Sequence, residues 1–401
     1  MEKQNTKPKL RFPEFTDKWE NKKLGEIAVK INSGKTPLGG ESVYTENGIL
    51  FIRSQNVFEN RLSYENSTFI PIEINNTMKN SVVKPNDILL NITGASLGRS
   101  CVVPENFSVG NVNQHVCIIR INRNNNPRFI QPIFASEKGQ KIFNSLQTGS
   151  GREGLNFQSI NSILLSFPSL PEQNRIASFL TAVDDKLTQL KQKKTLLEQY
   201  KKGVMQKIFS QQIRFRPALS EVDGVDNDKD YSDWEEKKLG ECLEYEQPTN
   251  YLVSSIEYND NYETPVVTAG KTFILGYTDE TTGIFNNNLP VIIFDDFTTA
   301  TQFVNFPFKA KSSAMKILKP KMGTNIKFIY EAMQMINYDI GGHGRHWISV
   351  FADMEILIPS LSEQTKIANF LSAIDDKINH TSTQLEKMQQ WKKGLLQQMF
   401  C

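Results

Sequence analysis

The sequence predicts a mixed α/β (α+β) protein in which two globular domains are separated by two long antiparallel helices, paired as a coiled coil with pseudo-two-fold symmetry. Three observations predict this fold class. A 42-residue segment occurs twice, each copy has an apolar stripe of helical spacing, and short apolar runs bounded by turn residues fill the rest. The expected boundaries are a globular domain at 1–167, a helical spacer at 168–209, a linker at 210–230, a second globular domain at 231–358 and a second spacer at 359–401.

The duplicated segment aligns without a gap. Residues 168–209 match 359–400 at a constant offset of 191, with 19 of 42 positions identical. The shared residues include Pro-Ser-Leu, Glu-Gln, Ile-Ala, Phe-Leu, Asp-Asp-Lys and Lys-Lys-Gly. A second, weaker sequence similarity lies upstream of each copy, where the sequence around Trp19 resembles that around Trp234. Gapless repetition over this length indicates that both copies have the same structural task.

Each copy is expected to be one long helix. Glu172 and Glu363 fall in the first turns, where a negative charge suits the helix dipole. A helix from about Glu172 to Phe209 would be on the order of 55 Å long. Counting alternately four and three residues onward from Ile176 or from Ile367 reaches mostly apolar residues, which is the pattern of a coiled-coil seam. Only lysines or a threonine interrupt it. The predicted pairing residues are Ile176, Leu180, Val183, Leu187, Leu190 and Leu197 in the first copy, and Ile367, Leu371, Ile374, Ile378, Leu385 and Met388 in the second.

Two equivalent stripes of this length bury each other most naturally across a two-fold axis, which makes the helices antiparallel. The alternative is that each stripe is ordinary core for its own neighbouring domain. The common sequence of the two copies favours the pair.

The two blocks between the repeats are expected to be mixed α/β domains. Apolar runs at 48–52, 87–90, 116–119 and 291–294 are bounded by Asn, Gly and Pro and predict strands. The segment 328–336 predicts a helix.

The composition excludes several classes of protein. Lys plus Arg is 46 and Asp plus Glu is 44, so the net charge of +2 excludes a histone-like polycation. No apolar run approaches the roughly 20 residues that span a bilayer, and the polar start does not fit a secretory signal, so we expect a cytoplasmic protein without a membrane partner. The cysteines are scattered, and His343 and His346 lie among glycines without an acidic or cysteine ligand nearby. We therefore expect no metal site.

No motif predicts catalysis by this chain. Gly-Lys-Thr at 34–36 and at 270–272 resembles the end of a phosphate-binding loop, but both lack its first glycine. The Asp-Asp pairs at 184–185 and 375–376 point about 100° apart on a helix, so they do not converge on one ion. We expect these carboxylates to form a solvated face or to meet a partner's basic groove. No catalytic residue is predicted.

Polar and basic side chains on turn-like segments are candidates for contacts with DNA, because they carry donors suited to phosphates and base edges. A solvated surface role is the alternative for each. The candidates are Lys35, Thr36, Arg53, Ser54, Gln55, Asn56, Arg99, Ser150 and Arg152 in the first block, and Lys309, Lys311, Ser312, Ser313, Arg345 and His346 in the second.

The order of variable block and helical repeat, twice over, resembles the specificity subunit of type I restriction-modification systems. The resemblance covers nearly the whole chain. It rests on the two repeats, on Asp-Ile-Leu-Leu at 87–90 followed by the segment from Gly94 to Arg99, and on Ser-Gly-Lys-Thr-Pro at 33–37. The second block has no clear equivalent of Thr36 and Pro37.

The resemblance implies two target recognition domains, each of which reads half of a bipartite site in double-stranded DNA. It also implies that two methyltransferase (modification) subunits dock on the repeats and that restriction/translocase subunits bind further out. This chain would hold no cofactor. S-adenosylmethionine for adenine N6 methylation, and ATP and Mg for translocation and cleavage, would belong to those partner subunits.

Other functions compete with DNA specificity. One is a non-catalytic coiled-coil scaffold, and a second is the DNA-recognition subunit of a related methyltransferase-only system. A third is an autonomous DNA enzyme, which the missing catalytic motifs disfavour.

Overall fold

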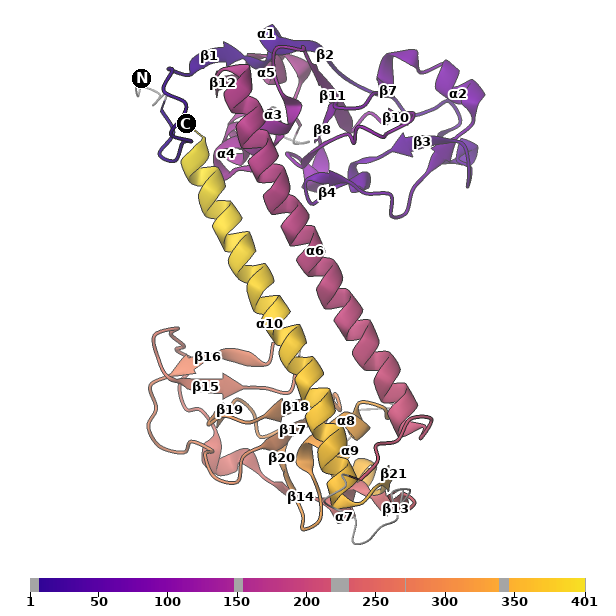
Figure 1. Ribbon diagram of the computed structural model, residues 1–401, viewed down its shortest axis with the longest axis vertical. Coiled ribbons are helices and arrows are strands. Elements are labelled where there is room, and N and C mark those ends of the chain that lie inside the picture. Colours follow the sequence, from indigo (N-terminus) through magenta and orange to yellow (C-terminus); the bar gives the residue numbers. More distant parts are fainter. Residues whose placement is uncertain (1–6, 148–153, 218–230, 271, 339–345, 401) are drawn as a thin grey trace. The chain divides into compact units, whose positions relative to one another are not determined.

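The computed structural model in Figure 1 describes residues 7–147, 154–217, 231–270, 272–338 and 346–400. The chain divides into two compact units. Unit 1 is Met1–Gln192 with Thr383–Cys401, and unit 2 is Lys193–Ser382. Two long helices, α6 (Leu170–Phe209) and α10 (Leu361–Met399), contribute to both. Each unit therefore combines one globular part with a segment of α6 and a segment of α10. Among the helices described, none is long and apolar enough to cross a membrane.

The globular part of unit 1 is built on small, mostly antiparallel sheets. β1 pairs with β12, a second sheet has the order β6-β3-β10-β7, a third has the order β2-β11-β8-β9, and β4 pairs with β5. The strands are Glu20–Lys23 (β1), Ala28–Ser33 (β2), Ile49–Ile52 (β3), Val57–Phe58 (β4), Arg61–Leu62 (β5), Phe69–Ile70 (β6), Val82–Val83 (β7), Ile88–Asn91 (β8), Ser100–Val102 (β9), Gly110–Val112 (β10), Val116–Ile121 (β11) and Leu164–Phe167 (β12). The helices are Leu24–Ile27 (α1), Ile72–Asn76 (α2), Pro127–Ala135 (α3), Glu137–Leu146 (α4) and Phe157–Ser162 (α5).

Unit 2 is built in the same way. β13 pairs with β21, one sheet has the order β14-β20-β17-β18, and another has the order β16-β15-β19. The strands are Glu235–Lys238 (β13), Leu243–Glu246 (β14), Thr264–Val267 (β15), Ile274–Thr278 (β16), Val291–Asp295 (β17), Thr301–Val304 (β18), Lys309–Ala310 (β19), Met315–Pro320 (β20) and Glu355–Ile358 (β21). The helices are Leu239–Cys242 (α7), Ile326–Met333 (α8) and His346–Ser349 (α9).

The two globular parts share one topology. The order β2-β11-β8-β9 in unit 1 corresponds to β14-β20-β17-β18 in unit 2, and β6-β3-β10 corresponds to β16-β15-β19. The correspondence includes one parallel pair in each unit, β3 with β10 and β15 with β19. The blocks share little sequence, so the common topology of the two globular parts becomes visible only in the structure.

The expected elements lie where the apolar patterns placed them. The four apolar runs are β3, β8, β11 and β17, and the helix expected at 328–336 is α8. β8 and most of β17 are buried on both faces, which requires a continuous apolar run. α3 and α8 both begin after an asparagine cap, because the side chains of Asn126 and Asn325 accept hydrogen bonds from backbone N–H groups of the first turn.

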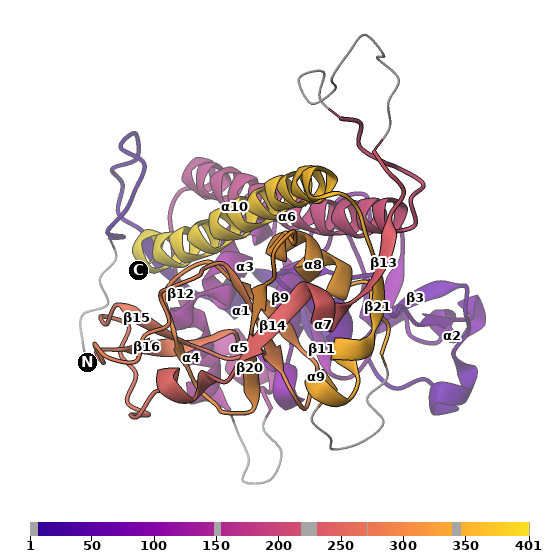
Figure 2. The same ribbon diagram turned by 90° about the horizontal axis from the view of Figure 1, so that it is seen from below.

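The seam of the long helices is buried in each unit. In unit 1, Ile176 and Leu180 of α6 belong to one core with Leu395 and Met399 of α10. In unit 2, the start of α10 belongs to one core with the end of α6, and α8 packs against them (Figure 2). The start of one helix thus meets the end of the other in each unit, as antiparallel pairing requires. The same cores include residues of the globular parts, so the stripe pairs the helices and also forms domain core.

Candidate nucleic-acid interface

A buried carboxylate fixes the start of α6 to unit 1. The Arg11 guanidinium donates to both oxygens of Glu172 at 2.7 Å, and the Trp19 indole N–H donates at 3.2 Å. The next residue, Gln173, accepts a hydrogen bond from the backbone N–H of Asn126 at 2.9 Å. The helix therefore begins at a defined place on the globular part.

Unit 2 repeats this arrangement at the start of α10. Arg214 and Trp234 donate to the buried Glu363, at 2.8 Å and 3.2 Å for the closest contacts. Gln364 accepts from the backbone N–H of Asn325 at 2.8 Å. This arrangement explains why the Glu-Gln pair occurs in both repeats and why the sequence around Trp19 resembles that around Trp234.

Ion pairs link the two long helices reciprocally. In unit 1, Lys392 of α10 is paired with Asp184 of α6. In unit 2, Lys201 of α6 lies 2.7 Å from Asp375 of α10. The prediction of a solvated face or a partner's groove missed these ion pairs, although the Asp184 side chain is still 44% exposed. The second acid of each pair, at 185 and 376, is exposed.

In unit 2 the ion pair is part of a half-buried network around the fully buried Glu331. Lys201 and Lys327 each contact both Glu331 and Asp375, at 2.6 to 3.0 Å. Burial raises the pKa of Asp375, but the hydrogen bonds and charges of the two lysines outweigh it, so the pKa lies below its ordinary value. Burial likewise opposes the charge on Lys327, and the two carboxylates outweigh it and raise the pKa of that lysine.

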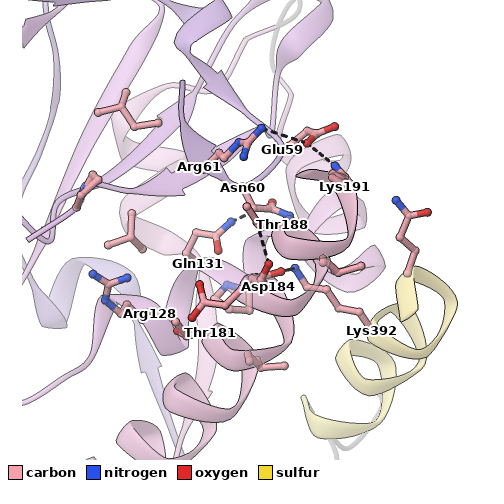
Figure 3. A pocket seen from close by; sticks show the side chains of 18 residues that line it. Glu59, Asn60, Arg61, Arg128, Gln131, Thr181, Asp184, Thr188, Lys191 and Lys392 are labelled. Carbon is pink, nitrogen blue, oxygen red and sulfur yellow. Dashed lines mark hydrogen bonds and ion pairs between the residues drawn. The ribbon is translucent and has the colours of Figure 1, made fainter. Parts of the chain in front are cut away.

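In unit 1 the equivalent ion pair borders a pocket of about 570 Å³ (Figure 3). The β4–β5 turn closes one side, where Glu59 accepts from Lys191 of α6 at 2.5 Å. Gln131 of α3 donates to the turn residue Asn60 at 3.1 Å. These contacts hold the turn that follows the 53–56 segment against α6.

The predicted pairing residues lie on the least exposed stripe of each helix. Leu197, Ile378, Leu385 and Met388 are half-buried. The others are buried, namely Ile176, Leu180, Val183, Leu187, Leu190, Ile367, Leu371 and Ile374.

Loops of unit 1 that are far apart in sequence meet at one end of its sheets. The hydroxyl of Thr36 donates to the exposed Gln114 at 2.8 Å, and Gln114 contacts His115 at 3.0 Å. His115 in turn lies 2.6 Å from the hydroxyl of Thr93. The close approach requires glycine at position 34, where a Cβ would lie 1.6 Å from the carbonyl oxygen of Val112. Lys35 is exposed beside this cluster.

Sequence reasoning selected Lys35 and Thr36 but missed Gln114, His115 and Thr93. A signal was available, because Asn-Gln-His stands between two strands. Its connection to the loop at 34–36 depends on strand order, which the sequence pattern alone did not reveal.

The segment after β3 lies beside the same loops. The carbonyl of Ser54 accepts from Asn91 at 2.8 Å, and Gln55 is exposed. The Arg53 guanidinium lies 5.8 Å from the centre of the Tyr44 ring. Asn56 does not fit the prediction of a DNA contact, because its side chain is fully buried and bonded to the backbone of this segment and of 63–65.

Arg99 follows the turn after β8 and is exposed. Its guanidinium lies 5.5 Å from the centre of the Phe58 ring, which is itself 44% exposed. The stacked aromatic ring holds the cation at the surface without neutralising it.

In unit 2 the turn after β19 occupies the position that 113–115 occupies in unit 1. The backbone N–H of Lys311 donates to Val267 as that of Asn113 donates to Ile52. Ser312 and Ser313 are exposed in this turn, and Lys311 is half-buried, with its ammonium 5.6 Å from the centre of the Tyr258 ring.

Lys309 is a correction to the predicted contacts. Its ammonium lies 2.7 Å from Glu280 and donates to the carbonyl of Thr282, and its side chain is only 4% exposed. The hydrogen bond from this lysine, with those from the backbone of Ser255 and Ser254, lowers the pKa of Glu280 to about 2. An ammonium so engaged cannot reach a phosphate.

His346 is likewise buried. Its backbone N–H donates to the carbonyl of Asp296, and the next residue, Trp347, donates to the carboxylate of Asp296 at 2.9 Å. The imidazole lies against Tyr338 instead of at the surface. Ser150, Arg152 and Arg345 lie outside the residues that the structure describes.

Over the described residues, no group of three or more His, Cys, Asp or Glu side chains is arranged to hold a metal ion.

Comparison with known proteins identifies the family. A family model described as the type I restriction modification DNA specificity domain matches residues 16–199 and 231–390. The chain belongs to this family. The family resemblance predicted from the repeats is thereby confirmed.

Two curated relatives are specificity subunits. The type I restriction enzyme EcoR124I/EcoR124II specificity subunit of Escherichia coli is 48% identical over 145 residues, which are 33% of this chain and 36% of that protein. The putative MjaX specificity subunit of Methanocaldococcus jannaschii is 23% identical over 299 residues, or 70% and 69% of the two chains. The chain thus spans about a third of the length of the first relative.

Solved structures confirm the fold class. The S subunit of a type I restriction-modification system from M. genitalium matches with a TM-score of 0.68 at 16% identity, over 98% of this chain and 99% of that one. A chain from a study of complex assembly and conformational transition of the type I system matches with a TM-score of 0.50 at 13% identity, over 94% and 96%. At these identities the likeness shows the fold of family members.

Proposed function

We propose that the chain is the DNA sequence-recognition (specificity) subunit of a type I restriction-modification complex. Each unit reads one half of an asymmetric, bipartite target in double-stranded DNA. The chain itself performs no chemistry. A methyltransferase-only complex would use the same recognition mechanism.

One observation carries this proposal: the two units share a topology and differ in the loops at its equivalent ends. Unit 1 presents Thr36, Gln114 and Arg99 there, whereas unit 2 presents Ser312 and Ser313. A constant frame with different polar side chains at one end is suited to reading two unrelated half-sites.

The loop chemistry is appropriate for this task. Exposed cations such as Lys35 and Arg99 supply salt-dependent affinity for phosphates. Amide and hydroxyl groups supply donors and acceptors for base edges. Each wrong base pair costs about 1 to 3 kcal/mol, so a few read positions per half-site are sufficient.

The helical repeats suit two copies of one partner. Identical residues face solvent at equivalent positions of the two helices, including Asp185 and Asp376, and Lys202 and Lys393. A surface displayed twice binds the same protein twice. We therefore propose that two methyltransferase subunits dock on the repeats, with restriction/translocase subunits further out. S-adenosylmethionine, ATP and Mg would belong to these cytoplasmic partners.

The proposal is tested by mapping adenine methylation in cells with and without this chain, which defines the target. Fluorescence anisotropy of the assembled complex then compares cognate and random duplexes. Tighter binding of the cognate duplex at moderate salt is expected. Equal affinities would favour a scaffold that does not read DNA, and methyl transfer or cleavage by the purified chain alone would establish an autonomous enzyme.

A further inference from the structure

We propose that the side-chain amide of Gln114 reads an adenine in the half-site of unit 1, through paired hydrogen bonds to N6 and N7 in the major groove. This inference rests on the proposed function and names one residue that confers its specificity.

The backbone of this residue is fixed by neighbouring loops. Gln114 lies in the short turn between β10 and β11, and its side chain is exposed. Before it, Asn113 donates to the carbonyl of Ile52 at 3.1 Å and accepts from the N–H of Gly34 at 3.1 Å. After it, the carbonyl of His115 accepts from Ile92 at 3.0 Å. The turn is therefore a rigid platform and not a free loop.

The side-chain amide is oriented as well. The hydroxyl of Thr36 donates to Oε1 of Gln114 at 2.8 Å, and Nε2 of Gln114 lies 3.0 Å from Nε2 of His115. An amide nitrogen can only donate, so this imidazole nitrogen accepts. The proton of the neutral ring then resides on Nδ1, 2.6 Å from the hydroxyl oxygen of Thr93, which accepts it. In this arrangement Oε1 of the amide faces Thr36 and Nε2 faces His115, so both ends of the amide are engaged.

Each end of the amide keeps one hydrogen-bonding site. The oxygen has two lone pairs and the nitrogen two protons, and these two contacts use one of each. Over the described part of the chain, these are the side-chain hydrogen bonds that Gln114 makes. The remaining lone pair and proton form an acceptor beside a donor, held without further loss of side-chain entropy.

That pattern is complementary to adenine. In the major groove, adenine presents the N7 acceptor beside the N6 amino donor, and a glutamine amide satisfies both. Guanine presents two acceptors, N7 and O6, so the amide oxygen would face O6 without a proton between them. The oriented amide therefore accepts adenine and rejects guanine at the same position.

The test uses the assembled complex and its mapped target. Each adenine of one half-site is replaced in turn by 7-deazaadenine, which lacks the N7 acceptor. For the wild type, one such replacement should weaken binding about 10-fold or more. For Gln114→Ala, the unmodified target should bind with a similar loss, and the same 7-deaza replacement should cause no further loss.

Gln158→Ala, which changes an exposed glutamine on α5, is the matched control and should behave as the wild type. Gln114→Glu keeps the size and polarity of the side chain but removes the donor, so it should show the same loss as Gln114→Ala. Unaltered melting temperatures would show that these exposed substitutions preserve the fold.

Several outcomes would overturn the inference. If Gln114→Ala weakens cognate and random duplexes equally, the residue contacts phosphate instead of a base. If the variant keeps the wild-type preference and still responds to 7-deazaadenine, the amide reads nothing. In both cases the wild type still discriminates its target, whereas a wild type without discrimination would contradict the proposed function itself.

Discussion

Lys201 of α6 donates to Asp375 of α10 at 2.7 Å, and exchanging the roles of the two repeats gives the other pair, Lys392 with Asp184. The Asp-Asp-Lys motif of each copy thus meets the Lys-Lys-Gly motif of the other. Reciprocal contacts of this kind are what a two-fold relation between equivalent helices produces. A charge at a seam position also disfavours a shifted register, because a shift would leave it without its partner.

Removal of the seam lysine should destabilise unit 2. Lys201→Met leaves Asp375 and the fully buried Glu331 with one cation fewer, and breaking a buried ion pair costs about 3 to 5 kcal/mol. The free energy of unfolding is measured by chemical denaturation. Lys202→Met, at the exposed next position, is the control, and equal stabilities of the two variants would contradict a structural role for the pair.

The ion pair between Lys201 and Asp375 should make the free energy of unfolding depend on pH. The pKa of Asp375 lies below its ordinary value of 3.8, so its contribution is present above that value and is lost as the pH falls through the lowered pKa. The gap in unfolding free energy between the wild type and Lys201→Met should therefore be largest near neutral pH and shrink below about pH 4. A gap that stays constant from neutral pH down to about pH 2 would show that the ion pair does not stabilise the fold.

Charges placed on the seam should disrupt the helix pair in both units. Leu187→Asp combined with Ile378→Asp removes one buried aliphatic side chain, worth roughly 1.5 to 3 kcal/mol, and one half-buried side chain worth less, and adds two charges on the seam. A large fall in the thermal midpoint is expected. The control is the double variant Lys186→Asp with Lys377→Asp, which changes the exposed neighbours of the two seam residues. If the seam variant is as stable as this control, the helices are not paired along the predicted seam.

Two nearby lysines of unit 2 should behave differently. Lys309→Met leaves the partly exposed Glu280 carboxylate with only the backbone N–H groups of Ser254 and Ser255 and should lower the free energy of unfolding by about 1 to 3 kcal/mol, whereas Lys311→Met should change it little. Because the hydrogen bond from Lys309 is the largest of the contacts that lower the pKa of Glu280 to about 2, the loss should be seen at neutral pH and fade as the pH falls below about 4.5. Full stability of Lys309→Met near neutral pH would contradict the structural assignment.

The exposed cations of unit 1 should contribute to affinity without contributing to specificity. Lys35→Ala and Arg99→Ala should each reduce the slope of log affinity against log salt by about 1 and weaken all duplexes alike. Salt titrations of the assembled complex by anisotropy measure this slope, with the exposed Lys18→Ala as the control. A selective loss on one base pair would instead mean that the cation reads a base.

Much of the helical framework could be predicted from the sequence, because helical spacing is a local pattern and the helical segment occurs twice. The seam from Ile176 to Leu197 follows from helical spacing, and its partner follows from the duplication. The roles of Asp184 and Lys392 could not be predicted in this way. They are 208 residues apart, and only the register of two packed helices brings them into contact.

The candidate interface was predictable only in part, since burial of a polar residue depends on tertiary structure. Lys309 lies in a two-residue strand, and its neighbours in sequence give no indication that its side chain is buried and paired with Glu280. Gln114 was missed for the opposite reason. A single exposed residue in a tight turn has no pattern of its own, and its importance follows from Thr36 and His115 on either side.

The most direct measurement replaces residues 234–358 with the corresponding segment of another family member and maps adenine methylation by the assembled complex. Because this segment contains the sheets and loops of unit 2, one half of the bipartite target should change and the other half should stay as it was. A change in both halves, or in neither, would contradict the claim that each unit reads its own half-site.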